Sequence, residues 1–131
     1  MPVNLPLTES LTVEFKSDRN GYPDHELIEA LTCLANTAGG ELWLGVEDDG
    51  TPSGLHRNHR NTRHLAKLIA EQTQPPLVVA VHKHAINNIT VAKISVPQAP
   101  HLIATLAGAY LRRRLKSDGT PECIHISPDH P

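Results

Sequence analysis

The chain has 131 residues, of which 39% are hydrophobic and only 3% aromatic, and its formal net charge is -2 at pH 7. This length is typical of one domain with an apolar core of its own, built here from Leu, Ile, Val and Ala. The near-neutral charge excludes a uniformly basic DNA-binding domain, so nucleic acid could be bound only by a local cluster of Lys and Arg. The scarcity of aromatic residues argues against stacking several bases on exposed rings.

The N-terminal half predicts a strand, a helix and a second strand. Alternation of apolar and polar residues over 11–15 predicts the first strand. An amphipathic helix is expected to start at Pro23-Asp24 and to end at Gly39-Gly40, where glycine can adopt the positive φ of a helix C-cap. The second strand is expected from about Glu41 to Glu47, and the acidic turn 48–52 follows it.

The C-terminal half predicts a second helix and further strands. Asn61 or Thr62 can cap a helix that continues through Gln72. Two β-branched runs, 77–82 and 89–96, are expected to form a hairpin, because Asn87-Asn88 between them tolerates a left-handed turn. A short strand is expected over 109–113.

The domain limits and the cysteines are interpreted together. We expect a single domain over 1–131 with a core at about 7–116, and an irregular tail over 117–131 that would lead into a longer protein. Cys33 and Cys123 lack the CxxC spacing of a thiolate zinc site, and Cys33 is expected to act as a small core residue. Because the chain shows no signal peptide and no 18-residue apolar run, we expect a cytoplasmic protein that does not contact membranes.

Carboxylates form the first candidate site. Glu9 and Glu14 belong to the first strand region, and Asp48 follows the second strand. If these two strands are neighbours, the three acids would meet at one end of the sheet and could hold Mg²⁺ or Mn²⁺ for phosphodiester cleavage. In the alternative interpretation, Glu14 pairs with Lys16 or an arginine and Asp48 is ordinary turn chemistry.

Basic residues form the second candidate site. The densest positive run contains Arg112, Arg113, Arg114 and Lys116, and in a strand Arg113 would point away from its two neighbours. A second group contains Arg57, Arg60 and Arg63. Together with Lys16, these side chains could neutralise several phosphates without a cofactor. The alternative is a solvated polar face.

Three blocks of the chain resemble one known family. The segment 9–16 is similar to its opening E-S-x-x-x-E-F-K block, and 34–50 is similar to its A-N-T-x-G-G-x-x-x-x-G-V-x-D-x-G block. Residues 109–112 resemble its later Y-x-R strand. The blocks occur in the family's order and span about 7–114. The chain therefore resembles the Schlafen/AlbA-type DNA-binding domain.

This resemblance implies a fold, a function and a site. The implied fold is α+β, with two main helices packed on a mixed β-sheet. The implied function is binding of DNA or RNA, often as the DNA-binding module of bacterial transcriptional regulators. In Schlafen-type RNases two Glu and one Asp cleave tRNA or rRNA, and they correspond to Glu9, Glu14 and Asp48. Vertebrate enzymes use two such lobes and this chain has one, so a homodimer is expected to complete a groove.

Three functions follow from these observations. The first is a nucleic-acid-binding module that contacts phosphates through seven cations: Lys16, Arg57, Arg60, Arg112, Arg113, Arg114 and Lys116. The second is a Mg²⁺- or Mn²⁺-dependent endoribonuclease at the three acids. The third is a protein-interaction or regulatory domain without nucleic acid. The first two require that the strand over 11–15 and the strand after Gly39-Gly40 lie side by side.

Overall fold

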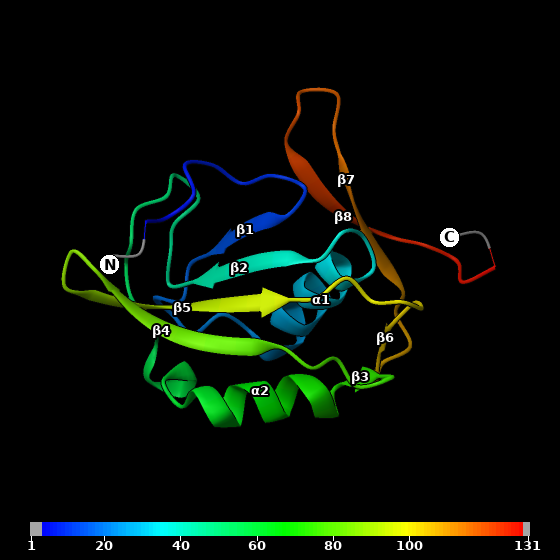
Figure 1. The fold of residues 1–131 in the computed structure, drawn as a ribbon, viewed down its shortest axis with the longest axis horizontal. Coiled ribbons are helices and arrows are strands. Elements are labelled where there is room, and N and C mark those ends of the chain that lie inside the picture. Colours follow the sequence, from blue (N-terminus) through cyan, green and yellow to red (C-terminus); the bar gives the residue numbers. More distant parts are fainter. Residues whose placement is uncertain (1–3, 130–131) are drawn as a thin grey trace.

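The computed structural model describes residues 4–129 and shows a mixed four-stranded sheet with two helices (Figure 1). The strands lie in the order β1 (Val13–Lys16), β2 (Gly40–Leu44), β5 (Ile89–Val96) and β4 (Ala80–Ile86). β1 runs parallel to β2, whereas the other neighbouring pairs are antiparallel. The α+β fold and the expected pairing of the first two strands are therefore confirmed.

The main core lies between the sheet and the two helices, α1 (Asp24–Ala35) and α2 (Thr62–Glu71). In Figure 1, α1 lies behind the sheet and α2 runs below β4. Leu27, Leu31 and Leu34 recur at helical spacing, so α1 presents one apolar stripe to the sheet. A smaller cluster around Phe15 and Trp43 fills the other face of the sheet. Among residues 4–129, no helix is both long enough and apolar enough to cross a membrane.

The double glycine joins α1 to β2 and sets the pairing with β1. Gly39 has φ +72° and donates its N–H to Leu34 O at 2.8 Å, which closes the last turn of the helix. At Gly40 a Cβ atom would lie 2.1 Å from the carbonyl oxygen of Thr12. Only glycine permits this approach, so Gly40 brings β2 against the segment that enters β1.

Two small sheets complete the fold. β3 (Thr73–Gln74) pairs with β6 (Ala104–Thr105), and β7 (Leu111–Leu115) pairs with β8 (Pro121–His125). Figure 1 shows the β7–β8 hairpin rising away from the main sheet. The irregular tail expected over 117–131 is therefore wrong in part, because residues 121–125 form a strand. Alternation was not evident there, since Pro121 and the short length obscure it.

Two smaller differences concern the start of the hairpin and the segment before α2. The expected hairpin forms, with Asn87 and Asn88 at φ +51° and +64°, but its first strand begins at Ala80 rather than at residue 77. In this register residues 77 and 78 would lie opposite Gln98 and Pro97, beyond the end of β5, and the N–H of Leu77 donates to Oγ1 of Thr73 instead. The first helical turn after residue 56 is the 3₁₀ helix η1 (Arg57–His59), which the sequence did not indicate.

A disulfide joins Cys33 of α1 to Cys123 of β8. Cys33 is buried as expected, but its expected role as an unpaired core residue is wrong, because the unforeseen strand β8 brings Cys123 to it. The two cysteines are 90 positions apart in sequence, and the bond joins the β7–β8 hairpin to α1. Structural disulfides are rare in the reducing cytosol, so this bond and the expected cytoplasmic location predict opposite thiol states in cells.

Removal of the disulfide is expected to destabilise the fold. Cys123→Ser replaces an exposed side chain and should lower the free energy of unfolding by about 4 kcal/mol, because the unfolded chain regains the entropy of a long loop. Urea unfolding followed by fluorescence of Trp43, the only Trp, measures the change. A thiol reductant should shift the wild-type protein equally and leave the variant unchanged. An unchanged midpoint in wild-type protein with two titratable thiols would contradict the prediction.

Candidate nucleic-acid interface and carboxylate pair

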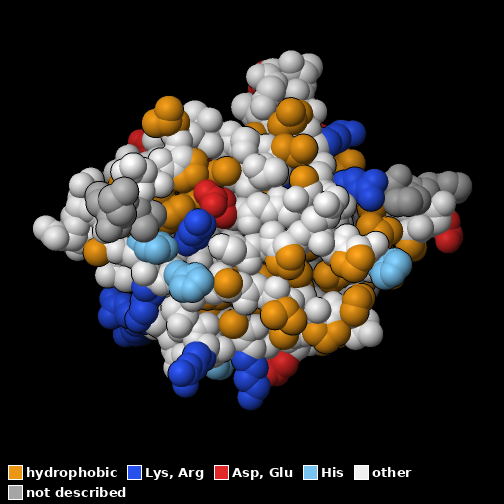
Figure 2. Space-filling model, viewed as in Figure 1, with side chains coloured by type: hydrophobic (Ala, Val, Ile, Leu, Met, Phe, Trp, Pro, Cys, Tyr) orange, Lys and Arg blue, Asp and Glu red, His pale blue; other side chains and the backbone are white. Residues whose placement is uncertain are grey.

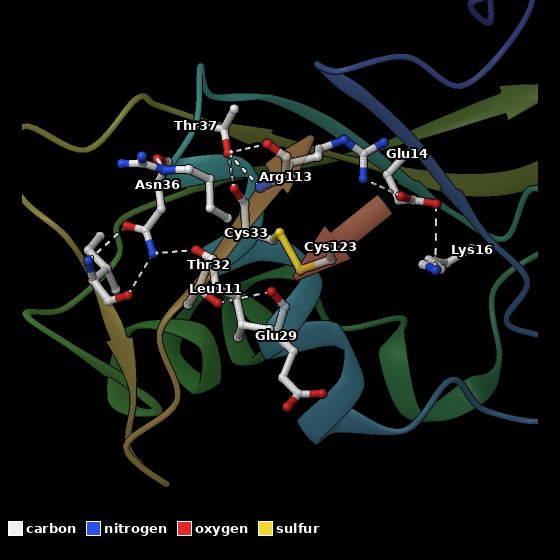
Figure 3. The surroundings of a disulfide bond; sticks show 12 residues. Glu14, Lys16, Glu29, Thr32, Cys33, Asn36, Thr37, Leu111, Arg113 and Cys123 are labelled. Carbon is white, nitrogen blue, oxygen red and sulfur yellow. Dashed lines mark hydrogen bonds and ion pairs between the residues drawn. A yellow bond between two sulfur atoms is a disulfide. The ribbon is translucent and has the colours of Figure 1, made fainter. Parts of the chain in front are cut away.

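Glu14 of β1 is a carboxylate held between two cations in the interior (Figure 3). Its side chain projects from the sheet toward α1 and β7, and the residue is 8% exposed. Nη1 of Arg113 donates to Glu14 Oε2 at 2.5 Å, and Nζ of Lys16 lies 3.5 Å from Oε1. A buried carboxylate requires such partners, since an unpaired charge in the interior is strongly disfavoured.

Arg113 of β7 covers the outer edge of β1. Its guanidinium donates from Nη2 to the carbonyl oxygens of Ser10 and Val13, each at 2.7 Å. The backbone N–H of Arg113 donates to Oγ1 of Thr37, just after α1, at 2.8 Å. Arg113 is 4% exposed. Arg113 therefore binds backbone carbonyl oxygens at this edge and does not reach solvent, so the structure corrects its assignment as a phosphate contact.

Glu9 meets the same edge strand from the N-terminal segment. The backbone N–H of Phe15 donates to Glu9 Oε2 at 2.9 Å. Glu9 thus accepts a hydrogen bond from β1 at Phe15, while Arg113 donates one to the carbonyl oxygen of Val13 on the same strand. Asp48 lies in the exposed turn after β2, close enough that its charge acts on Glu9. The structure accordingly brings Glu9 and Glu14 together, with Asp48 at the margin of the pair.

The two carboxyl groups titrate in opposite directions. Burial, together with a hydrogen bond to Glu14 and the charges of Glu14 and Asp48, raises the pKa of Glu9 to about 7. Burial alone would raise the pKa of Glu14 as well. The hydrogen bond from Glu9 and the charges of Lys16 and Arg113 outweigh burial and lower that pKa. Below about pH 7 the pair therefore holds one proton, on Glu9, while Glu14 stays ionised.

The carboxylates do not form a metal site in this arrangement. Among residues 4–129, no three acidic, His or Cys side chains are placed to hold one ion. The oxygens of Glu14 face Arg113 and Lys16, and Glu9 Oε2 accepts from a backbone N–H. A cation in their midst would have to displace two positive charges, so the residues do not fit the Mg²⁺ or Mn²⁺ that the family resemblance implies.

The arginine run of β7 divides into two faces, as its alternation predicts. Arg112 is half-buried and donates from Nε to the carbonyl oxygen of Asn36 at 3.3 Å. Arg114 is exposed and donates to Glu122 of β8 at 2.7 Å. Lys116 is exposed in the hairpin turn. The run is therefore not one continuous patch, since Arg113 is internal and Arg114 already has an acidic partner.

The second basic group lies at the start of α2. Arg57 and Arg60 are exposed, and among residues 4–129 neither forms a salt bridge. Figure 2 shows Lys and Arg side chains gathered along the lower left and lower edge of the molecule, beside α2. This group is separated from the β7–β8 hairpin, which rises from the opposite side of the sheet (Figure 1).

A buried histidine anchors this basic group. Nδ1 of His59 lies 2.9 Å from Asp18 Oδ1, and its Nε2 lies 2.9 Å from Asp24 Oδ1. These hydrogen bonds outweigh burial and raise the pKa of His59 to about 9. The charged imidazole thus fixes η1 to the start of α1. Sequence reasoning missed this contact, because no motif or periodicity links residue 59 to residues 18 and 24.

The family model described as "Schlafen, AlbA_2" matches residues 9–120 of this chain. The match begins at Glu9 and includes the carboxylate pair, the double glycine and β7. No curated protein matches the sequence.

Two solved structures are similar to the fold. One is the crystal structure of the DIP2311 protein of Corynebacterium diphtheriae, with 23% identity and a TM-score of 0.71 over 88% of this chain. The other is the solution structure of an N-terminal domain from Nitrosomonas europaea, described as ATP-dependent DNA helicase RecG-related, with 25% identity and a TM-score of 0.57 over 70% of this chain. The matches cover 25% of the first protein chain and 65% of the second.

The stability of the protein is expected to depend on the protonation of Glu9. Its pKa rises from 4.5 in the unfolded chain to about 7 on folding, so the folded state binds more protons between these values and the free energy of unfolding falls as pH rises through them. Glu9→Gln can still accept from Phe15 and cannot ionise. In urea unfolding from pH 4.5 to 8, the free energy of unfolding of the variant should rise relative to that of wild type up to about pH 7.

His59 also makes the stability depend on pH, and it does so equally in wild type and in Glu9→Gln. Its stabilisation is full below pH 6.5 and is lost as pH rises to about 9, so it cancels in the comparison. Parallel stability curves for wild type and Glu9→Gln between pH 4.5 and 7 would contradict the assigned proton.

Proposed function

The chain belongs to the Schlafen AlbA_2 family, and from this premise we propose that it binds nucleic acid by contacting phosphates with exposed Lys and Arg side chains. The similarity to a domain described as DNA helicase RecG-related supports a nucleic-acid-related role. The observation that carries the proposal is the pair Arg57 and Arg60, which are exposed, lack acidic partners among the described residues and are held in place by the His59 anchor.

The cations are expected to contribute unequally to the binding of phosphate. Arg57 and Arg60 contribute most, because among residues 4–129 no carboxylate forms a salt bridge with them. Arg112, Arg114 and Lys116 of the hairpin contribute less, since Arg114 is paired with Glu122. Lys16 is paired with Glu14 and half-buried, so it contributes least. Arg113 is buried, so it supports binding only by stabilising the fold.

The proposed mode of binding is electrostatic rather than base-reading. Phe15 and Trp43 are buried, which leaves the two half-buried tyrosines as the other aromatic side chains. Few rings are thus offered for stacking on bases. Phosphate contacts position a nucleic acid without reading its sequence, so we expect little sequence preference. We further propose DNA as the ligand, a role as the DNA-binding module of a transcriptional regulator, and a homodimer that joins two such surfaces.

Binding should weaken steeply with salt and depend on the α2 end of the molecule. Arg57→Gln/Arg60→Gln should lower affinity for a fluorescent DNA duplex about ten-fold or more and reduce the slope of log K against log salt by about 2, because two phosphate contacts are lost. Fluorescence anisotropy over a salt series measures both quantities.

The matched control is Arg114→Gln/Lys116→Gln, which removes the same charge from the hairpin. Its effect should be clearly smaller, since Arg114 already has Glu122 as a partner. Equal affinity of wild type and the α2-end variant would refute the assignment of this surface. Absence of any binding to DNA or RNA at low salt would favour the protein-interaction alternative.

The meeting of Glu9 and Glu14 favours a second candidate, cleavage of RNA at the carboxylate pair. Near neutral pH Glu9 can take up or release a proton beside the ionised Glu14, which is the property that acid–base cleavage requires. Incubation of structured RNA with and without Mn²⁺ tests it, with Glu9→Gln as the variant. Cleavage that persists in the variant, or none by wild type, would remove this candidate.

A further inference from the structure

A polar pocket of about 460 Å³ opens on the α2 side of the sheet, away from the carboxylate pair. It lies between the loop that follows β2 and the strands β4 and β5. Its lining consists of Ser53, Gly54, Leu55, Arg60, Lys83 and Thr90. The arginine run of β7 contributes no residue to this lining.

Two cations face this pocket from different elements. Arg60 follows η1, and Lys83 lies in the middle of β4. Both side chains are exposed, and within the described part of the chain neither is in salt-bridge contact with a carboxylate. Two positive charges that share one pocket repel each other, so an anion bound between them relieves this repulsion and gains two charge-assisted contacts.

One carboxylate, that of Glu47, contacts this lining through Ser53 and has a cationic partner outside the pocket. Glu47 accepts a hydrogen bond from the hydroxyl of Ser53, and Arg19 Nε lies 3.8 Å from the same carboxylate. The carboxylate therefore holds Ser53 in place rather than pairing with Arg60 or Lys83. Thr90 supplies a neutral hydroxyl at the pocket wall. The lining thus offers a guanidinium, an ammonium and a hydroxyl, which is a set of donors suited to a tetrahedral oxyanion.

The backbone around the pocket is fixed without a ligand. Leu55 donates its N–H to Thr90 O at 3.0 Å, which fastens the loop to β5. Lys83 pairs in register with Ala92 across the β4–β5 ladder. The turn before Arg60 is held by the contacts of His59 with Asp18 and Asp24. A site that is organised in advance loses little freedom on binding.

We propose that this pocket binds a phosphate group between Arg60 and Lys83. The inference rests in part on the proposed function, because a backbone phosphate of the bound nucleic acid is the expected source. The pocket is larger than one phosphate and is open to solvent, so the sugar and the rest of the nucleic-acid chain can extend out of it. The same chemistry would accept inorganic phosphate or the phosphate of a free nucleotide.

Titrations followed by amide chemical shifts test the proposal. Inorganic phosphate, a nucleoside 5′-monophosphate and a short DNA duplex are added separately to wild type, Lys83→Gln and the control Lys67→Gln, which changes an exposed lysine paired with Glu71 outside the pocket. The duplex should shift the amides of Gly54, Leu55 and Thr90. Lys83→Gln should weaken duplex binding about five-fold and remove these shifts, whereas Lys67→Gln should retain them.

The outcomes separate the pocket from the proposed function. Duplex binding that leaves these amides unshifted, or that Lys83→Gln does not weaken, overturns the pocket while the proposed function stands. Shifts of these amides with phosphate or nucleotide, in a protein of which the duplex shifts no amide at all, support the pocket with a free phosphate as its source and refute nucleic-acid binding. If none of the three ligands shifts these amides, the pocket proposal is wrong. The unfolding midpoint of each variant confirms that the protein remains folded.

Discussion

The buried ion pair between Glu14 and Arg113 is the contact on which the arrangement of this domain depends. It joins residues that are 99 positions apart in sequence and fastens the β7–β8 hairpin to the edge of the main sheet. An isolated pair of this kind costs desolvation free energy. Here the guanidinium offsets that cost by donating to the carbonyl oxygens of Ser10 and Val13, each of which also accepts the backbone N–H of the other residue. One side chain thus combines charge pairing with binding of the backbone.

This arrangement has a consequence for the carboxylates. Glu9 and Glu14 lie together as the family resemblance implies, but each satisfies a structural need of β1 or of Arg113. A metal ion would have to compete with Arg113 and Lys16 for the same oxygens. For the exposed Arg57 and Arg60, the His59 anchor fixes the backbone, and within residues 4–129 neither side chain forms a salt bridge with an acidic group. The proposed phosphate contacts therefore lie on that surface and not at the acids.

Much of the fold could be predicted from local patterns. Helical spacing in α1, the double glycine and the Asn87-Asn88 turn each act within a few residues, and each was recognised in the sequence. The side-by-side placement of β1 and β2 was a condition of the candidate site that no local pattern supplied, and the structure meets it. What escaped prediction is long-range: β8, the disulfide it completes, and the contacts of His59 with Asp18 and Asp24. The arginines show the same limit, because alternation predicts that Arg113 differs from its neighbours but cannot say that it is the buried one.

A double-mutant cycle on Glu14 and Arg113 tests this account most directly. Glu14→Gln, Arg113→Met and the combined variant are compared with wild type by urea unfolding, with Trp43 fluorescence as the signal. Each single change should lower the free energy of unfolding by about 3 kcal/mol or more, because it strands the partner charge in the interior. The combined variant should lose little more than either single variant, which corresponds to a coupling energy of about 2 kcal/mol or more. Additive losses, or single variants as stable as wild type, would contradict the central role of this pair.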